Sequence, residues 1–440
     1  MSGLERRQTP KTRPMQQKRT ALVASLDIGT SKVACMIARL KPCPTSEALR
    51  GRSHAIELIG YSQIQSRGVK AGAVVDLAEC EQAVRQAVAL AERMAKVRVE
   101  SVLLSVSGGR LQGCLIEAAA DIKGGAVTPA DIIRVTSTGM RHATGDGRTV
   151  LHALPVGYAL DGVKGIRDPK GMVARQFGVD MNVVTSDATV ARNLMLAVER
   201  CHLNVEAMAS GPYVAGLSVL TDDEADIGAA VIEMGAGTTT MAVYSGGHFV
   251  HASGFALGGQ HITMDLARGL GACIADAERI KTLYGTVLTG GSDARELMSV
   301  PSAGDDRDAP QVVSRATIAN IVRHRAEEIF EMVRDRLADS PFAAEPRARV
   351  VLSGGASQLT GIPDLASRIL SRQVRIGRPL GFARLPNEAR SASFAVPSGL
   401  LVYPQYAHLE HVEPRHTRQL LRTGTDGYFG KVGRWLREGF

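Results

Sequence analysis

Apolar residues recur at two spacings along the first hundred positions, and each spacing predicts a different element. Residues 20–40, "TALVASLDIGTSKVACMIARL", predict two strands joined by a tight turn, because apolar and β-branched residues flank a run of small ones. A further strand and a glycine-bearing loop are predicted over residues 56–76. Residues 77–97 place apolar side chains at helical spacing with charges between them, which predicts an amphipathic helix. Residues 99–108 predict a strand that ends at a diglycine.

The pattern changes at residues 110–178, where short strand-like stretches alternate with Gly, Asp and Pro turns. Strands are predicted at 113–120 and 149–160, with one helix near 128–143. This alternation of short strands, one helix and turns predicts a small α+β insertion. A helix over 187–201 resumes the earlier pattern.

The second half repeats the strand–turn–strand theme. Residues 227–259 predict a second glycine-turn hairpin, followed by a helix from about 262 to 270 and a polar loop at 302–310. A long amphipathic helix is predicted over 314–340. Residues 348–370 predict a strand, a diglycine turn and a helix. The stretch 406–426 is polar and without periodicity, so we expect a flexible linker there.

Composition and charge narrow the class of protein. A chain of 440 residues is too long for one hydrophobic core, so two to four subdomains are expected. Its six cysteines are scattered without a CxxC pair, which argues against a disulfide framework or a zinc site and fits a reducing compartment. No stretch approaches 18 uncharged apolar residues, so no membrane-spanning segment is predicted.

Much of the net charge of +8 lies at the ends of the chain. The first twenty residues hold six Lys or Arg and one Glu. We interpret residues 1–19 as a disordered, solvated basic arm. An arm that touches nucleic acid or acidic lipid is the alternative.

Three glycine turns carry the candidate chemistry: "SLDIGTSKV" at 25–33, "VIEMGAGTTTMAV" at 231–243 and "VVLSGGASQL" at 350–359. Each follows an apolar strand. A hairpin tip of small residues exposes successive backbone N–H groups, and these form an anion-binding concavity suited to phosphate. Asp27 and Glu233 each precede a tip and are candidates to hold a hydrated Mg²⁺, which prefers carboxylates, waters and phosphate oxygens.

A single glycine hairpin is most often only a hairpin, so the combination and spacing of all three matter. That combination resembles the actin-like ATPases, a superfamily that includes actin, MreB, sugar kinases and heat-shock chaperone ATPases. A closer resemblance is carried by "LDIGTSKV", "VLHALPVGYALDG", "VERCHLNVEAM", "GGQHITMDLARGL", "DAERIKTLYG", "VVLSGGASQLTGI" and "VRIGRP". Together these motifs resemble the FtsA family of bacterial cell-division proteins, from about residue 20 to 405 and again in the terminal segment.

The resemblance implies an α/β, actin-like two-lobed fold with mixed sheets flanked by helices. A small α+β insertion subdomain replaces one actin subdomain. The implied division of the chain is lobe one at 20–109, 179–225 and 380–405; the insertion at 110–178; lobe two at 226–379; the linker at 406–426; and a terminal helix at 427–440.

The resemblance also implies ATP and Mg²⁺ as cofactors. The implied nucleotide-binding residues are Asp27, Gly29, Thr30, Ser31, Lys32, Gly235, Gly237, Thr238, Gly258, Gly259, Glu278, Lys281, Gly354 and Gly355, with Asp27 and Glu233 near the metal. Without the resemblance, an ordinary exposed i, i+3 pair on a helix is the preferred interpretation of Glu278 and Lys281.

The second turn departs from the family's Asp-x-Gly-Gly-Gly-Thr, because it has Glu233 in place of Asp and Ala236 in place of a Gly. The extra methylene of Glu displaces its carboxylate, and no general base can be placed by spacing. We therefore expect ATP binding with at most weak ATPase activity, and assign no catalytic residue.

The chain ends in "GYFGKVGRWLREGF". On a helix, one face would hold aromatic and aliphatic residues with cations around it, the pattern of an interfacial membrane binder. The residues expected at an anionic lipid surface are Tyr428, Phe429, Lys431, Val432, Arg434, Trp435, Leu436, Arg437 and Phe440. The alternative is a last helix that packs on its own domain. The FtsA family ends in a membrane-targeting helix after a flexible linker, which favours the membrane.

By resemblance, the protein is a peripheral one at the division septum, on the cytoplasmic face of the inner membrane. The implied partners are the C-terminal peptide of FtsZ, further copies of the chain in a head-to-tail filament, and later division proteins at the insertion. No nucleic-acid partner is predicted. Arg325 and Glu328, on the predicted helix 314–340, are candidate FtsZ contacts; a solvated helix face is the alternative. Competing classes are a sugar kinase and another actin-like scaffold, such as MreB or a pilus-assembly homologue.

Overall fold

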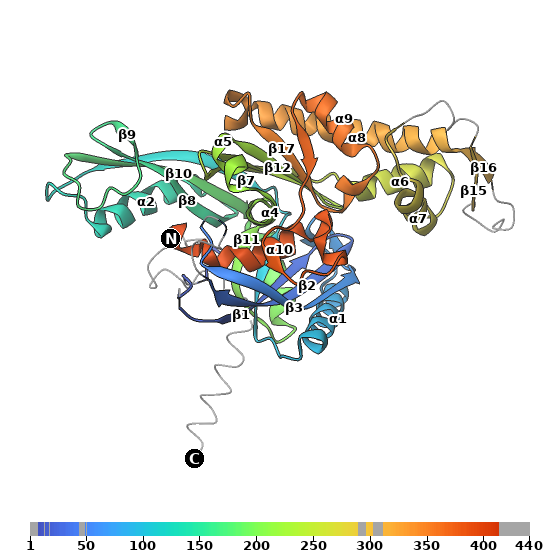
Figure 1. Ribbon diagram of the computed structural model, residues 1–440, viewed down its shortest axis with the longest axis horizontal. Helices are drawn as coiled ribbons and strands as arrows, with labels where there is room; N and C mark the ends of the chain where they lie inside the picture. The colour runs from blue at the N-terminus through green and yellow to red at the C-terminus, as the bar shows by residue number, and fades with distance from the viewer. Residues whose placement is uncertain are drawn as a thin grey trace, which may run out of the picture.

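The computed structural model describes residues 8–12, 14–16, 18–43, 49, 51–288, 296–301 and 311–412. Two sheets with helices between and around them form two lobes (Figure 1). Within the described ranges, no helix combines the length and apolarity needed to cross a bilayer.

Lobe one is built on a six-stranded sheet with the order β11-β6-β1-β2-β3-β19. Its strands are β1 (Ala21–Ile28), β2 (Lys32–Pro42), β3 (His54–Gln65), β6 (Ser101–Val106), β11 (Asn204–Ser210) and β19 (Phe382–Ala383). A small hairpin, β4 (Val69–Lys70) with β5 (Ala73–Val74), lies beside it. The helices of this lobe are α1 (Leu77–Ala95), α3 (Ala188–Glu199), α4 (Gly211–Val219) and α10 (Ala395–Val402).

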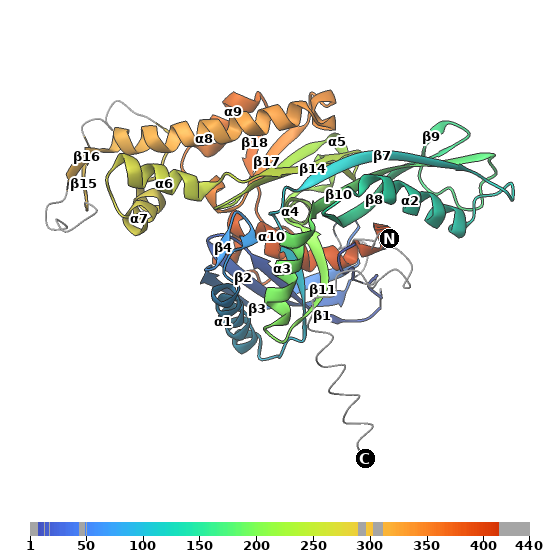
Figure 2. The same ribbon diagram turned by 180° about the vertical axis from the view of Figure 1, so that it is seen from behind.

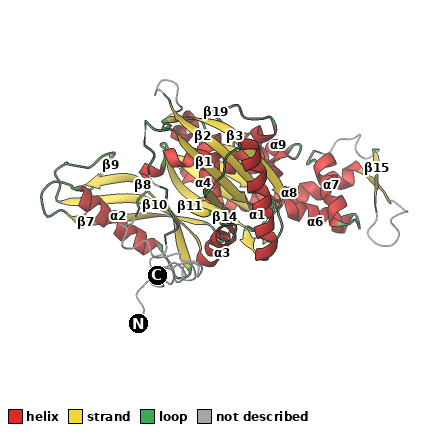
Figure 3. Cartoon of the chain, turned by 90° about the horizontal axis from the view of Figure 1, so that it is seen from below, coloured by secondary structure: helices red, strands yellow, loops and turns green. Residues whose placement is uncertain are grey.

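Both faces of β2 are buried, which explains its near-continuous apolar sequence. Cys35 and Ile37 join the core beneath α1, whereas Met36 and Ala38 join the core beneath α10. Figure 3 shows α1 lying across the strands of this sheet. The helix α1 begins where the side chain of Asp76 accepts a hydrogen bond from the N–H of Glu79.

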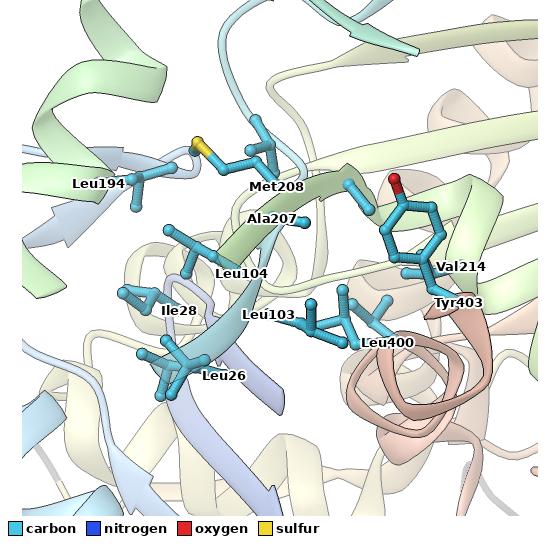
Figure 4. Packing of buried hydrophobic residues seen from close by; sticks show 14 of the residues in the cluster. Leu26, Ile28, Leu103, Leu104, Leu194, Ala207, Met208, Val214, Leu400 and Tyr403 are labelled. Carbon is cyan, nitrogen blue, oxygen red and sulfur yellow. The ribbon is translucent and has the colours of Figure 1, made fainter. Parts of the chain in front are cut away.

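Side chains from strands and helices far apart in the sequence form the core of lobe one (Figure 4). Leu26 and Leu104 come from neighbouring strands, and Leu400 comes from α10 near the end of the body; all three are fully buried. The fold of lobe one therefore requires the chain to return to it after lobe two is complete.

The second sheet has nine strands with the order β18-β17-β12-β13-β14-β7-β10-β8-β9. They are β7 (Gln112–Asp121), β8 (Arg148–Leu160), β9 (Val163–Ile166), β10 (Gln176–Asp187), β12 (Ala229–Met234), β13 (Thr239–Ser245), β14 (His248–Phe255), β17 (Arg349–Ser353) and β18 (Val374–Ile376). The pairing of Ser253 with Gln112 joins β14 to β7. The insertion thus continues the sheet of lobe two (Figure 1).

The remaining elements belong to lobe two and the insertion. They are α2 (Pro129–Ala143), α5 (Asp222–Ile227), α6 (Gly259–Gly269), α7 (Ile274–Tyr284), α8 (Arg315–Ala338), α9 (Ile362–Leu370), β15 (Leu297–Val300) and β16 (Gln311–Ser314). In lobe two, Ile232 of β12 joins the core beneath α8, while the adjacent Val231 joins the core that contains α4. The rear view shows α8 running along the outer side of this sheet (Figure 2).

Three predicted boundaries differ in the structure. The sequence ends the insertion at residue 178, but β10 pairs with β7 from Gln176 and with β8 from Phe177, so the insertion's sheet continues to Asp187. The predicted helix after the diglycine is delayed: a 3₁₀ turn (Gly355–Gln358) comes first, and α9 begins only after Gly361 at φ +83°. The helix expected from 262 begins at Gly259, since the ring of His261 accepts the N–H of Gly258.

The two ends of the body overturn two expectations. The basic arm is not solvated throughout, because Thr9 and Thr12 are buried and the N–H of Thr9 donates to the carbonyl of Val150 at 3.0 Å. The linker does not begin at residue 406 either: a 3₁₀ turn (Ala407–Leu409) follows, and Glu410 is buried. The terminal helix predicted at 427–440 lies outside the described residues.

Candidate nucleotide site

The two predicted phosphate turns have the same internal geometry. In the first, the N–H of Gly29 donates to the carbonyl of Lys32 at 2.9 Å; in the second, the N–H of Gly235 donates to the carbonyl of Thr238 at 2.9 Å. An added Cβ would lie 3.0 Å from the accepting oxygen in both turns. Both turns therefore need glycine at the same position for close backbone approach.

The tips of the two turns meet. A Cβ on Gly237 would lie 2.4 Å from the hydroxyl oxygen of Thr30 and 3.0 Å from its Cβ. The hydroxyl of Thr30 in turn accepts a hydrogen bond from the N–H of Gly72 at 3.3 Å. The structure thus brings the β1–β2 turn of lobe one and the β12–β13 turn of lobe two together, although about two hundred residues separate them.

Asp27 and Glu233 lie on β1 and β12, two positions before the glycine of each turn. Asp27 accepts a hydrogen bond from the hydroxyl of Ser105 at 2.5 Å, and Glu233 accepts one from Thr240 at 3.4 Å. Burial raises the pKa of Asp27, with Ser105 and Lys32 opposing it. Burial, and then repulsion from Asp27, raises the pKa of Glu233 to about 7.

Lys32 is held at the edge of this site. Burial lowers its pKa, and the charges of Asp27 and Glu233 oppose that shift. Its ammonium donates to the carbonyl of Ser393 at 2.5 Å and lies 4.4 Å from the ring centre of Phe394. This cation–π contact fixes the lysine beside the two carboxylates.

The two carboxylates fit a divalent cation. Desolvation disfavours the anionic form of both, and the charge of Asp27 further raises the pKa of Glu233, so a cation between them would relieve both. Across the described part of the chain, no three His, Cys, Asp or Glu side chains come together as a metal cage. The donor set of two carboxylates matches Mg²⁺ held through waters and phosphate oxygens.

The start of α6 supports the second turn from behind. The N–H groups of Gly259 and Gln260 donate to the carbonyls of Gly235 and Ala236 at 2.9 Å and 2.8 Å. A Cβ on Gly258 would lie 2.5 Å from the carbonyl oxygen of Gly235. The sequence predicts direct nucleotide contacts from Gly258 and Gly259, but the N–H of Gly259 is already engaged by the turn.

Glu278 and Lys281 pair on α7 at 2.7 Å, and Lys281 has a further role. Its ammonium also donates to the carbonyl of Gly259 at 3.1 Å and to the hydroxyl of Thr263 at 2.8 Å. Only 13% of its side chain is exposed, against 51% for Glu278. The ordinary surface-pair interpretation therefore fails for Lys281, which ties α7 to the start of α6.

The third turn has one glycine in a strained position and one that faces open space. Gly354 adopts φ +86°, and a Cβ there would lie 2.4 Å from the carbonyl oxygen of Met234. Its N–H donates to the carbonyl of Ala392 at 3.0 Å. A Cβ on Gly355 would meet no atom within 4 Å, so this position leaves room for a ligand beside the second turn.

Comparison with known proteins shows to which family this chain belongs. A cell division protein FtsA from Agrobacterium fabrum is 46% identical to this chain over 433 residues, covering 98% of each. The chain belongs to the FtsA family. The family model described as "Cell division protein FtsA" matches residues 230–399, and the model described as "SHS2 domain inserted in FTSA" matches residues 108–185.

Solved structures show that this FtsA-family chain has an actin-like fold. A structure of the PilM–PilN type IV pilus biogenesis complex covers 87% of this chain and 98% of its own, with a TM-score of 0.60 and 16% identity. MreB 5 of Spiroplasma citri, solved bound to AMPPNP, covers 89% of this chain and 98% of its own, with a TM-score of 0.51 and 15% identity. The actin-like fold and the insertion subdomain predicted from the sequence are confirmed.

Several residues of the site were not predicted. Ser105 is the only polar residue among the buried positions of β6, and its interruption of the apolar run could have identified it. Ser393, Phe394 and Thr263 have no comparable local signal, because they reach the site only through the fold. The segment that contains Ala392 and Ser393 connects the third turn to Lys32.

The two candidate FtsZ contacts are already engaged within the FtsA-family body. Arg325 makes a bidentate pair with Asp265 of α6, at 2.5 Å and 3.0 Å, and also pairs with Glu328. About a quarter of the Arg325 side chain and half of the Glu328 side chain are exposed. Their role toward FtsZ stays a prediction.

A cavity of about 1000 Å³ lies away from the predicted turns. Its lining includes Glu224 of α5, Arg349 at the start of β17 and Arg375 of β18. None of the predicted nucleotide residues borders it. Gly354 follows the opposite end of β17, so the cavity and the three turns lie at opposite ends of the same strand.

Proposed function

We propose that this protein binds ATP with Mg²⁺ between its lobes and tethers FtsZ filaments to the cytoplasmic face of the inner membrane at the division septum, polymerising as it does so. The observation that carries the nucleotide part is the contact between the turns at Thr30 and Gly237, with the half-buried Asp27 and the buried Glu233 on the strands that lead into them. Membership of a family named for cell division supports the rest.

The turns supply the groups that bind phosphate. The N–H groups of residues 30–31 and 236–237 make no hydrogen bond to another group in the described chain, whereas those of Gly29 and Gly235 close the turns. Successive free N–H groups at a hairpin tip bind phosphate oxygens well. Gly354 and Gly355 would lie against the adenosine, because Gly355 faces open space beside the second turn.

The carboxylates of Asp27 and Glu233 would hold Mg²⁺ through water. Bound there, Mg²⁺ would neutralise charge on the phosphate oxygens and the carboxylates. Lys32, held by Ser393 and Phe394, adds a positive charge beside the same oxygens.

Hydrolysis should be slow at best. The extra methylene of Glu233 displaces its carboxylate from where an Asp would place it, and a pKa of about 7 leaves that carboxylate only partly ionised at neutral pH until a cation binds. Among the described residues, Asp27 and Glu233 are joined by no third acidic or His side chain. Nucleotide would then act mainly by holding the two lobes together.

The attachment to the membrane rests on the sequence of the terminal segment. Aromatic and cationic residues on one short helix suit the boundary of an anionic leaflet. Arg325 and Glu328, whose side chains on α8 are about a quarter and a half exposed, remain our candidates for the acidic or basic groups of the FtsZ peptide. A head-to-tail contact that does not close would give a filament.

Co-sedimentation with liposomes tests the tether. The full chain, a truncation ending at Thr425, and a Trp435→Ala variant would each be spun with anionic or neutral vesicles, with and without FtsZ. We expect only the full chain to pellet strongly with anionic vesicles and to carry FtsZ with it. Equal pelleting of the truncation would move the membrane site elsewhere in the chain. No pelleting of any form would contradict the tether, and a sugar-phosphorylation assay would then test the kinase alternative.

A further inference from the structure

The only described part of the basic arm that is buried lies where the insertion meets lobe one. We call residues 8–12 the N-terminal strap. The N–H of Thr9 donates to the carbonyl of Val150 on β8 at 3.0 Å, and the N–H of Met208 on β11 donates to the carbonyl of Pro10 at 3.1 Å. The strap therefore bridges a strand of the insertion and the edge strand of the lobe-one sheet.

A buried charge cluster fixes the strap. The ammonium of Lys11 lies 2.5 Å from a carboxylate oxygen of Glu410, and their side chains are 3% and 1% exposed. Lys11 also donates to the carbonyl of Leu151 and to the hydroxyl of Tyr403 at 3.3 Å. A buried lysine with several acceptors is held far more firmly than a surface one, because none of these contacts competes with water.

His152 completes the cluster, and its tautomer follows from its partners. The N–H of Ser210 donates to Nε2 at 2.8 Å, so Nε2 carries no proton in the neutral ring. Nδ1 then carries the proton and donates to the other oxygen of Glu410 at 2.6 Å. Burial raises the pKa of Glu410, but Lys11 and His152 outweigh it and lower the pKa to about 2. Glu410 is thus a permanent anion that serves both partners.

The C-terminal end of the body is fastened at the same place. The N–H of His411 donates to the carbonyl of Ala153 at 2.8 Å, and its carbonyl accepts from the side chain of Gln8 at 3.1 Å. Its ring lies between the hydroxyls of Thr136 and Ser137 on α2, at 2.9 Å and 3.0 Å. The segment that leads into residues 413–440 therefore contacts both the insertion and the strap.

We propose that the N-terminal strap is an intramolecular clamp. It fixes the insertion against lobe one and anchors the root of the C-terminal tail, so that a displacement of the tail is passed to β8 and β11. Without the strap, β8 and lobe one keep the Ser210–His152 hydrogen bond and the packing of Leu151 and Leu154 but lose the bridge through Thr9 and Pro10. Among the described residues, Glu410 then keeps only His152 and Tyr403. The clamp concerns the body of the protein and does not depend on what the tail or the nucleotide turns bind.

Hydrogen exchange of the full chain, read by mass spectrometry, tests the clamp. Lys11→Met removes the ammonium and leaves Glu410 buried beside neutral His152. We expect exchange to rise at least about tenfold in peptides from β8, from α2 around Thr136 and Ser137, and from residues 403–411, while peptides from β12 and β13 stay unchanged. Lys18→Met, an exposed lysine of the same arm, is the matched control and should change none of these regions.

A second variant keeps the proposal testable if Lys11→Met does not fold. A chain that starts at Pro10 keeps the Lys11–Glu410 pair but loses the hydrogen bonds of Gln8 and Thr9, and it should show the same regional pattern to a smaller extent. Unchanged exchange in β8 and residues 403–411 would overturn the clamp. So would a rise of equal size in β12 and β13, because that would show only a general loss of stability.

Discussion

Gly237 of lobe two lies so close to Thr30 of lobe one that a Cβ on the glycine would be 2.4 Å from the threonine hydroxyl oxygen. The absence of a side chain at this position is what lets the two phosphate turns meet. The distance between the two lobes at this point therefore depends on one residue in each lobe, Thr30 and Gly237.

Gly237→Ala should therefore hold the turns apart and weaken nucleotide binding. The methyl group must displace Thr30, whose hydroxyl also accepts the N–H of Gly72, so the first turn is disturbed as well. We expect at least about a tenfold loss of ATP affinity, with a small change in melting temperature. Fluorescent-nucleotide titration measures it, and Gly157→Ala, where a Cβ meets nothing within 4 Å, is the control. Unchanged affinity would place the nucleotide elsewhere.

Glu233→Gln should make the nucleotide-free protein more stable while weakening Mg²⁺-dependent binding. The folded pKa of Glu233, about 7, lies above the usual 4.5, so the folded state holds this proton more tightly. Its contribution to stability is present below pH 4.5 and is lost as the pH rises through 7. At pH 8 the neutral amide should gain roughly 1–3 kcal/mol, measured by urea unfolding without nucleotide.

The Mg²⁺ dependence of ATP binding by Glu233→Gln gives an independent test of whether Glu233 holds the metal. Because the carboxylate ionises near pH 7, the Mg²⁺ dependence of ATP affinity should strengthen between pH 6 and pH 8 in the wild type. Calorimetric titration should show this pH dependence flattened in Glu233→Gln. A variant that kept the wild-type pH dependence would exclude Glu233 from the metal.

Most of the nucleotide turns could be predicted from the local sequence, because the constraints on their residues are short-range. Gly29 and Gly235 are needed by turns that close within four residues, and their neighbours follow strand patterns. Gly354 is needed through φ and a contact with Met234. Such constraints select residue type at one position, so they can be recognised before the fold is known.

The N-terminal strap and its contact with Glu410 could not be predicted from the local sequence. Lys11 is surrounded in sequence by other cations, which predicts solvation, yet it pairs with Glu410 nearly four hundred residues away. Glu410 itself lies in a polar stretch that predicts a linker. Neither residue carries a local mark of burial; each is buried only because β8 and Tyr403 supply its remaining hydrogen-bonding partners.

The two histidines beside Glu410 should make the protein sensitive to mild acid. Burial lowers the pKa of His411 to about 4 and also lowers the pKa of His152. The unfolded chain then binds protons more readily between about pH 6.5 and 4, so stability should fall as the pH drops through this window. His411→Gln should flatten the slope by up to about 1.4 kcal/mol per pH unit, the effect of one proton.

Urea unfolding at half-unit steps from pH 4.5 to 7.5 measures that slope. His324→Gln, on the exposed face of α8, is the control and should leave it unchanged. A slope in His411→Gln equal to that of the wild type would mean that His411 is not buried in the neutral form.

Arg325→Ala should weaken binding of the FtsZ C-terminal peptide, but the pair with Asp265 complicates its interpretation. Arg325 joins α6 to α8 through that bidentate pair, so its loss also costs stability, on the order of 1 kcal/mol for a pair whose side chains are about a quarter exposed. The exchanged variant Asp265→Arg with Arg325→Asp separates the effects, because it restores an intrachain pair but reverses the charge offered on α8. If Arg325 contacts FtsZ, fluorescence anisotropy should show lost peptide affinity in both variants, while the melting temperature recovers only in the exchanged one. Recovery of both would show that Arg325 acts only within the fold.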